Sequence, residues 1–207
     1  MDELPEFSRE TLESLRQPME EKKICIVRGG RNYCFPSNFM MIAAMNPCPC
    51  GYYPNFERCS CSAYDVQHYL GKISGPLLDR IDMSVEVPAS RFPIGMDETK
   101  TENSAEIRAR VQKARERQQI RYKKYGFLYN SQLNVPVMRE ICWLGREEEK
   151  MMEKAFETFN LSMRSYYRTL KVARTIADLS GSDFICCEHL TEALCYRMIN
   201  KKYWVGR

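Results

Sequence analysis

The sequence predicts an α/β segment followed by an all-helical segment, and three observations support this fold class. Two runs rich in β-branched and aromatic residues flank the glycine pair Gly29–Gly30. Apolar runs at residues 39–45 and 83–87 are too short for helices and are bounded by turn residues. Beyond residue 103 the apolar residues recur with the period of a helix. Strands are therefore expected first, and helices alone afterwards.

A stretch without periodicity separates the two segments. Residues 89–102 carry proline, glycine and mixed charge, which is typical of a linker. We therefore predict one domain at residues 1–88 and a second at residues 103–207. The length of 207 residues suits two small domains.

Composition limits the class of protein. Of the residues, 44% are hydrophobic and 28% are charged, as in ordinary globular proteins. The net charge of +4 is too small to indicate a nucleic-acid partner by itself. No apolar run approaches the roughly 18 residues of a membrane-spanning helix, and the first residues are acidic where a secretory leader is basic. We therefore expect a cytoplasmic protein that does not enter a membrane.

The first elements are a helix and a hairpin. Ser8 is a candidate N-cap for a helix with Leu12 and Leu15 on one face, and Pro18 bends or ends that helix. The run ICIVRGGRNYCF then predicts a β-hairpin, because both central residues of a tight turn need positive φ. A buried strand is expected at residues 39–45.

A turn-rich cysteine loop follows at residues 47–62, and a helix is expected at residues 63–70. Pro76 opens a short helical turn that ends near Arg80. Residues 83–87 are expected to form a second strand. The helices expected beyond the linker are 104–125, 146–159, 162–179 and 188–203.

The helix from residue 104 is strongly basic. A basic stripe can follow a nucleic-acid backbone, but it is more often a solvated face, which we favour here. Its cationic residues are Arg108, Arg110, Lys113, Arg115, Arg117, Arg121, Lys123 and Lys124.

Four of the ten cysteines lie close together in the sequence, as two C-x-C pairs. Four thiolates in one loop suit tetrahedral Zn²⁺, although C-x-C is tighter than the usual zinc spacing of C-x₂₋₄-C. Free thiols or a disulfide remain alternatives. The candidate ligands are Cys48, Cys50, Cys59 and Cys61.

The other six cysteines are scattered among apolar neighbours. In a reduced compartment we expect them to be small buried hydrophobic residues rather than a disulfide framework. They are Cys25, Cys34, Cys142, Cys186, Cys187 and Cys195.

The run MIAAMNPCPCGYY and the later run CSCSAYDVQHYLGKISGPLLDRIDMSVEVP resemble the second half of an AAA+ ATPase. The sequence of these two runs is most similar to the magnesium-chelatase subunit I-like family, in its ComM/YifB branch. This resemblance implies the C-terminal half of an AAA+ core, with an incomplete sheet and a β-hairpin insertion, followed by an α-helical lid. No GxxxxGK[ST] phosphate loop occurs in the 207 residues.

Three positions then resemble catalytic residues. Asp2 and Glu3 resemble the end of a Walker B strand, which holds Mg²⁺ and orients the attacking water; a chance acidic dipeptide is the alternative. Asn46 resembles sensor 1, whose neutral amide helps to bind the γ-phosphate; an Asn-Pro turn is the alternative.

Several arginines resemble further parts of such a motor. Arg80 resembles the arginine finger; a surface ion cluster with Asp79 and Asp82 is the alternative. Arg164 resembles sensor 2 of the lid, with Arg168 as the second choice and an exposed helix arginine as the alternative.

The hairpin resembles the β-hairpin insertion that projects into the central pore of the ring in these AAA+ proteins. There Arg28 and Arg31 would meet phosphates and Tyr33 would stack on a base; an ordinary solvated hairpin is the alternative.

Two functions follow. The resemblance implies a ring-forming ATPase, expected to be a hexamer, that uses ATP and Mg²⁺ for DNA translocation or branch migration. Lacking a phosphate loop, the chain alone is expected to be inactive. The alternative is a non-enzymatic zinc module that binds nucleic acid or protein.

Overall fold

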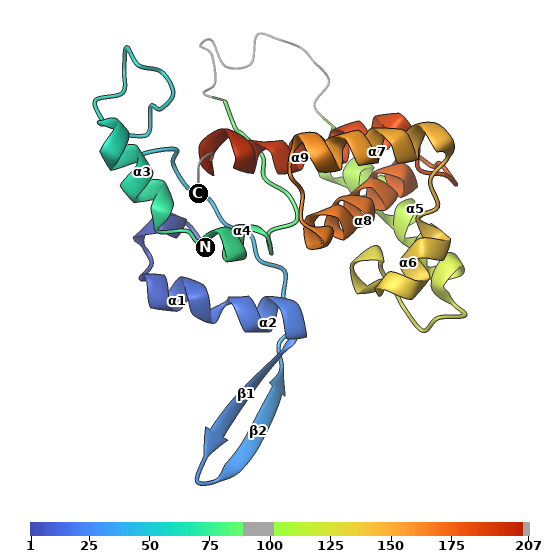
Figure 1. Ribbon diagram of the computed structural model, residues 1–207. Helices are drawn as coiled ribbons and strands as arrows, with labels where there is room; N and C mark the ends of the chain where they lie inside the picture. Colours follow the sequence, from blue (N-terminus) through green and yellow to red (C-terminus); the bar gives the residue numbers. More distant parts are fainter. Residues whose placement is uncertain (89–101, 205–207) are drawn as a thin grey trace. The chain divides into compact units, whose positions relative to one another are not determined.

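The computed structural model describes residues 1–88 and 102–204 (Figure 1). The chain divides into two compact units, one of Met1–Ile81 with the residues from Asn200 onward, and one of Asp82–Ile199. The linker predicted at residues 89–102 lies, apart from Glu102, outside the described residues. Within the described residues, no helix combines the length and the apolar character needed to cross a membrane.

The first unit begins with two short helices. The Ser8 hydroxyl accepts a hydrogen bond from the Thr11 N–H, which confirms the predicted N-cap. The helix is interrupted at Leu15, because Pro18 has no N–H to bond the carbonyl one turn earlier. The elements are η1 (Leu4–Glu6), α1 (Arg9–Ser14), α2 (Arg16–Glu21), β1 (Lys23–Arg28), β2 (Arg31–Pro36), α3 (Ala63–Gly71) and α4 (Gly75–Leu78).

Strands β1 and β2 form the predicted antiparallel hairpin. Gly29 and Gly30 have φ values of 58° and 72°, which residues with a side chain rarely adopt. The turn sets the register, so that Arg28 pairs with Arg31 and Cys25 pairs with Cys34.

The strands predicted at residues 39–45 and 83–87 are wrong for the described chain, because both segments lack regular strand pairing. Their apolar side chains are exposed rather than buried: Met40 is 83% exposed and Val87 is 86% exposed. A β-strand forms only where a neighbouring strand exchanges backbone hydrogen bonds with it along its edge. In the first segment, the backbone of Met1 and Leu4 supplies a few such hydrogen bonds. In the second segment, the Ser84 N–H donates at 3.0 Å to the carbonyl of Tyr196, which belongs to a helix.

Two small apolar clusters hold the first unit together. One gathers Leu12 from α1 and Leu77 from α4, and the other packs Cys48 against Val66 and Leu70 of α3. Trp204 packs on both clusters and donates its indole N–H to the Leu70 carbonyl at 3.0 Å.

The second unit is helical, as predicted, and its boundaries lie close to those expected. Helix α6 was not predicted; it is short, and its first turn contains a proline. Asn103 caps α5 in a capping box with Glu106. The elements are α5 (Ser104–Tyr122), η2 (Asn130–Gln132), α6 (Val135–Ile141), α7 (Arg146–Thr158), α8 (Met163–Leu179) and α9 (Cys187–Trp204).

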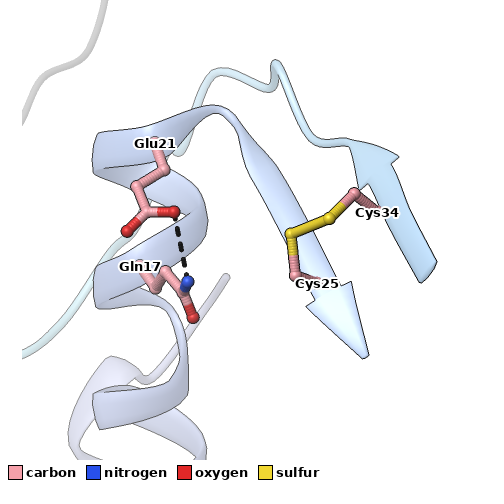
Figure 2. The surroundings of a disulfide bond; sticks show 4 residues. All are labelled: Gln17, Glu21, Cys25 and Cys34. Atoms are coloured by element: carbon pink, nitrogen blue, oxygen red, sulfur yellow. Dashed lines mark hydrogen bonds between the residues drawn. A yellow bond between two sulfur atoms is a disulfide. The ribbon is translucent and has the colours of Figure 1, made fainter. Parts of the chain in front are cut away.

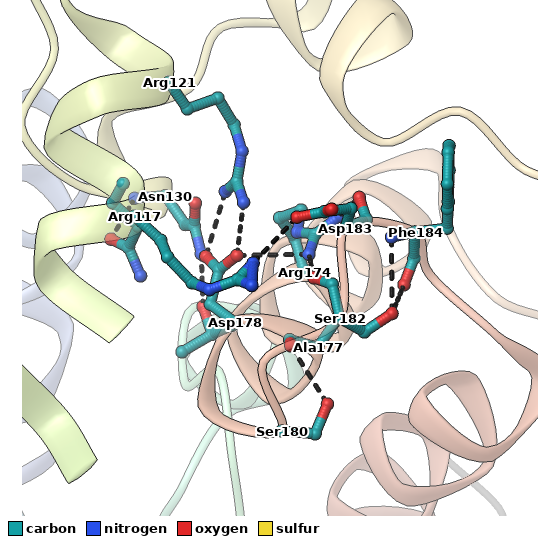
Figure 3. A network of polar contacts seen from close by, with 12 residues as sticks. Arg117, Arg121, Asn130, Arg174, Ala177, Asp178, Ser180, Ser182, Asp183 and Phe184 are labelled. Carbon is teal, nitrogen blue, oxygen red and sulfur yellow. Dashed lines mark hydrogen bonds and ion pairs between the residues drawn. The ribbon is translucent and has the colours of Figure 1, made fainter. Parts of the chain in front are cut away.

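A buried ionic network links α5 to α8 in this unit (Figure 3). Asp178 is 2% exposed and accepts from Arg121 at 3.0 Å, from Asn130 at 3.0 Å and from the buried Arg174 at 3.1 Å. Arg117 donates to Asp183 at 2.7 Å. Two cations of the basic helix, Arg117 and Arg121, are therefore engaged in ion pairs within the fold, which neither the solvated-face interpretation nor the nucleic-acid stripe predicted.

Candidate functional site

The acidic pair at the N-terminus lies beside the segment that leads to Asn46. The Met1 amino group donates to the Ile42 carbonyl at 2.7 Å, and the Ala44 N–H donates to the Met1 carbonyl at 2.9 Å. These two bonds have the pattern of a parallel bridge between Met1 and Ala43. Because the two segments run in the same direction, Asp2 and Asn46 follow the bridge at the same end.

Both acidic residues of this pair are solvent-exposed. The Glu3 N–H donates to the Asp2 carboxylate at 2.9 Å, and Glu3 itself has a left-handed φ of 50°. The left-handed residue turns the chain into η1, whose Leu4 N–H bonds the Ala44 carbonyl at 3.0 Å. The carboxylates therefore stand at a turn that is anchored on both sides.

Asn46 is also exposed, and it begins the cysteine loop. The side-chain amide of Asn46 lies beside Gly51. A side chain at position 51 would bring its Cβ within 3.9 Å of the Asn46 amide oxygen. Gly51 has a φ of 83°, and its N–H donates to the Cys48 carbonyl at 3.0 Å. The turn around the first cysteines therefore lies against the amide that is the candidate sensor.

Arg80 follows the short helix α4, and its side chain is 10% exposed. Its guanidinium forms an ion pair with Glu20 of α2 and donates to the Pro76 carbonyl at 2.7 Å. The surface cluster with Asp79 and Asp82 was the alternative predicted for this arginine. Glu20, from a distant helix, is an acidic partner that this alternative did not include.

Arg164 and Arg168 lie on α8, in the second unit. Arg164 is exposed in the first turn, after Ser162, which caps the helix by accepting from the Ser165 N–H at 3.1 Å. Arg168 forms an ion pair with Asp82. The two candidates thus lie one turn apart on α8 and differ in exposure, Arg164 being exposed and Arg168 half-buried.

The hairpin presents a basic and aromatic face. Arg28 and Arg31 are opposite each other at the tip, and the next pair on the same face is Ile26 with Tyr33. These residues, together with Phe35, line a shallow hollow of about 700 Å³. The hairpin thus carries two cations beside exposed apolar surface.

The four loop cysteines are brought together. Their sulfur atoms all lie within 4.8 Å of one another, with Cys48 and Cys59 3.8 Å apart and Cys50 and Cys59 3.5 Å apart. Four sulfurs at about 2.3 Å from a tetrahedral Zn²⁺ would be about 3.8 Å apart. The Tyr53 N–H points at the Cys48 sulfur at 3.4 Å, an outer-shell contact that favours a thiolate. The cluster can therefore hold a metal ion.

The thiols of this cluster do not titrate alike. A hydrogen bond from the backbone of Tyr52 lowers the pKa of Cys50 to about 5. A backbone bond from Cys50 acts to lower the pKa of Cys61, but burial and the neighbouring sulfurs outweigh it and raise that pKa to about 12. Crowded thiols resist ionising together, and a bound cation removes that penalty.

The expectation for the six scattered cysteines is largely wrong. Cys25 and Cys34 form a disulfide between the exposed strands of the hairpin (Figure 2), whereas Cys186 and Cys195 are exposed free thiols. Cys142 is buried as expected, and Cys187 is half-buried. The sequence did contain the signal, because Cys25 and Cys34 are each four residues from the glycine pair and the turn makes them opposite.

Comparison with known protein families identifies the family of the chain. The profile of "Magnesium chelatase, subunit ChlI" matches residues 1–93, and that of "Magnesium chelatase, subunit ChlI C-terminal" matches residues 101–197. The chain belongs to the magnesium chelatase subunit ChlI family. Within this family it lies in the ComM/YifB branch.

Individual relatives support that membership. The chain is 42% identical over 200 residues to competence protein ComM of Haemophilus influenzae, covering 95% of this chain and 38% of ComM. It is 42% identical over 206 residues to the uncharacterised protein YifB of Escherichia coli, covering 97% of this chain and 39% of YifB. The chain thus spans about two fifths of the length of these members of the ChlI family.

Proposed function

We propose that this chain forms part of a ring-shaped ATPase that couples ATP hydrolysis to movement on DNA. The observation that carries the proposal is the parallel bridge between Met1 and Ala43, which sets Asp2 and Asn46 at one end of adjacent segments. The two hydrogen bonds hold these segments side by side, so Asp2 and Asn46 can approach one ligand from adjacent segments. Membership of the ChlI family supports the assignment.

In this proposal, the acidic pair and Asn46 have different roles in phosphoryl transfer. Asp2 would hold the hydration shell of Mg²⁺, Glu3 would orient the attacking water, and the Asn46 amide would contact the γ-phosphate. When bound, Mg²⁺ neutralises charge on the phosphate oxygens.

Two arginines complete the site. Arg80 reaches the nucleotide of a neighbouring protomer, where a guanidinium can donate two parallel bonds. Arg164 of the helical segment, with Arg168 as the second choice, contacts the nucleotide of its own protomer. Assembly into a ring, as a hexamer, is therefore part of the proposal.

The test is ATP turnover by a full-length protein that contains this chain. Arg80→Ala is expected to lower turnover by about 10³-fold or more, whereas the exposed Arg139→Ala should leave it unchanged. The 207-residue chain alone is expected to show no turnover. Equal turnover by both variants would reject Arg80 as the arginine finger, whereas no turnover by the unmodified full-length protein would reject the ATPase proposal.

DNA is the proposed substrate because the hairpin tip places Arg28 and Arg31 beside Tyr33. Cations meet backbone phosphates and an aromatic ring stacks on a base. One relative is named a competence protein, which fits a role in handling DNA. Replacing both arginines by Ala should weaken binding and flatten its dependence on salt; unchanged binding would reject this role.

A second candidate function is a zinc module, favoured by the four converging sulfurs. Cys48, Cys50, Cys59 and Cys61 would hold Zn²⁺ as thiolates, and the ion would staple a loop that has little apolar core. This structural role is compatible with the ATPase proposal. If the full-length protein has no ATPase activity, the zinc module becomes the main proposed function of this chain.

A further inference from the structure

The hairpin has little support from the rest of the protein. Every residue of β1 and β2 is solvent-exposed, so the strands bury no apolar core. At the base, the Ser37 N–H donates to the Lys22 carbonyl at 2.7 Å. An isolated two-stranded hairpin is marginally stable in water. Its order therefore depends on whatever links its two strands.

The disulfide between Cys25 and Cys34 is such a link. The two residues are directly opposite in the register, and their Cα atoms are 4.1 Å apart, as in a pair without mutual backbone bonds. Closing a loop of about ten residues by a disulfide shifts an order–disorder equilibrium by about 100-fold. The stabilisation that the disulfide gives is thus large compared with the marginal stability of the two strands alone.

The disulfide lies behind the proposed DNA-binding face. Side chains alternate along a strand, so Cys25 and Cys34 point away from the face that carries Arg28, Arg31 and Tyr33. The bond can therefore form or break without changing the chemical groups of that face. It changes only how firmly those groups are held.

We propose that Cys25 and Cys34 are a reversible redox staple that sets the affinity of the hairpin for DNA. The proposal rests on the DNA-binding role given above. Ordered arginines lose less conformational freedom on binding than disordered ones, so the oxidised hairpin binds more tightly.

The exchange balances with a dithiol reductant. One thiolate of the dithiol attacks a hairpin sulfur, the S–S bond breaks, and a mixed disulfide forms. The second thiol of the reductant then displaces the remaining cysteine. Two electrons and two protons pass to Cys25 and Cys34, and the reductant leaves as its own disulfide. A small-molecule disulfide such as oxidised glutathione drives the reverse reaction.

The experiment compares the 207-residue chain after treatment with dithiothreitol and after oxidised glutathione. Mass spectrometry of alkylated peptides reports the state of Cys25 and Cys34. Hydrogen exchange of the hairpin amides should be at least 10-fold faster in the reduced chain. Affinity for a single-stranded oligonucleotide, from fluorescence anisotropy, should fall about 5-fold or more on reduction.

Two variants serve as controls. The double variant Cys25→Ser, Cys34→Ser should behave like the reduced chain under both treatments, with unchanged exchange in α8 showing that it is folded. Cys195→Ser should keep the response. Equal hairpin exchange in both redox states of the unmodified chain would overturn the staple. Absence of DNA binding in both states would overturn the DNA role instead, while the exchange rates still decide the staple.

Discussion

The guanidinium of Arg80 is bound by the carboxylate of Glu20, which lies 60 positions earlier in the chain. Glu20 belongs to the last turn of α2, and β1 begins at Lys23, separated from that helix by Lys22 alone. The proposed arginine finger is thus tied to the helix that precedes the hairpin proposed to bind DNA. A finger that acts on a neighbouring nucleotide must exchange this carboxylate for a phosphate.

We therefore predict that Glu20→Gln raises ATP turnover of the full-length protein several-fold, because it removes the competing carboxylate. A partly exposed ion pair is worth about 1 kcal/mol, which corresponds to about 5-fold. Glu21→Gln is the matched control, since Glu21 lies on the same helix and accepts a bond from Gln17 of that helix at 3.1 Å. Lower turnover in Glu20→Gln would mean that the carboxylate positions the arginine for reaction.

The buried carboxylate of Asp178 is predicted to be essential for the stability of the second unit. In Asp178→Ala, Arg121 and Arg174 lose their shared anion, and removing one partner of a buried ion pair costs about 3–5 kcal/mol. Urea denaturation gives the free energy of unfolding. Asp183→Ala is the control: this exposed partner of Arg117 should cost less than about 1 kcal/mol. Similar losses for both variants would contradict the prediction.

The parts that could be predicted from sequence are those governed by local rules. The glycine pair fixed the hairpin, and the cap residue Ser8 marked the start of a helix. The strands at residues 39–45 and 83–87 failed because a strand depends on a neighbour that the local sequence does not reveal.

The candidate site divides in the same way. The clustering of the four loop cysteines was predictable because they are close in sequence, and the structure brings them together. The partners of Arg80 and Asp178 were not predictable, because each ion pair joins residues from distant elements. The charge of a side chain shows that it needs a partner, whereas tertiary packing decides which one it finds.

Metal binding by the cysteine loop is predicted to be measurable in the chain alone. Protein purified without added zinc should contain about one equivalent by elemental analysis, and Cys61→Ser should reduce this to below about 0.2 equivalents. Cys186→Ser, which changes an exposed cysteine outside the cluster, is the control. Removing the ion with a chelator should increase hydrogen exchange in α3, since the loop packs on Val66 and Tyr69. A metal-free protein with an unchanged loop would contradict the structural role.

The stability of the second unit should fall in alkali because of Tyr122. This side chain is fully buried, its hydroxyl donates to Asn130, and burial raises its pKa to about 12. In the unfolded chain the phenol ionises near pH 10. The folded pKa is the higher one, so the contribution of Tyr122 is complete below pH 10 and is lost as the pH rises from 10 to 12.

At pH 11 this linkage amounts to about 1.4 kcal/mol. Between pH 8 and pH 11, the unmodified chain should therefore lose about that much more free energy of unfolding than Tyr122→Phe, which has no phenol to ionise. Cys142, whose pKa burial also raises to about 12, is present in both proteins and cancels from the difference. Equal losses in the two proteins would show that the phenol of Tyr122 ionises in the folded state as readily as in water.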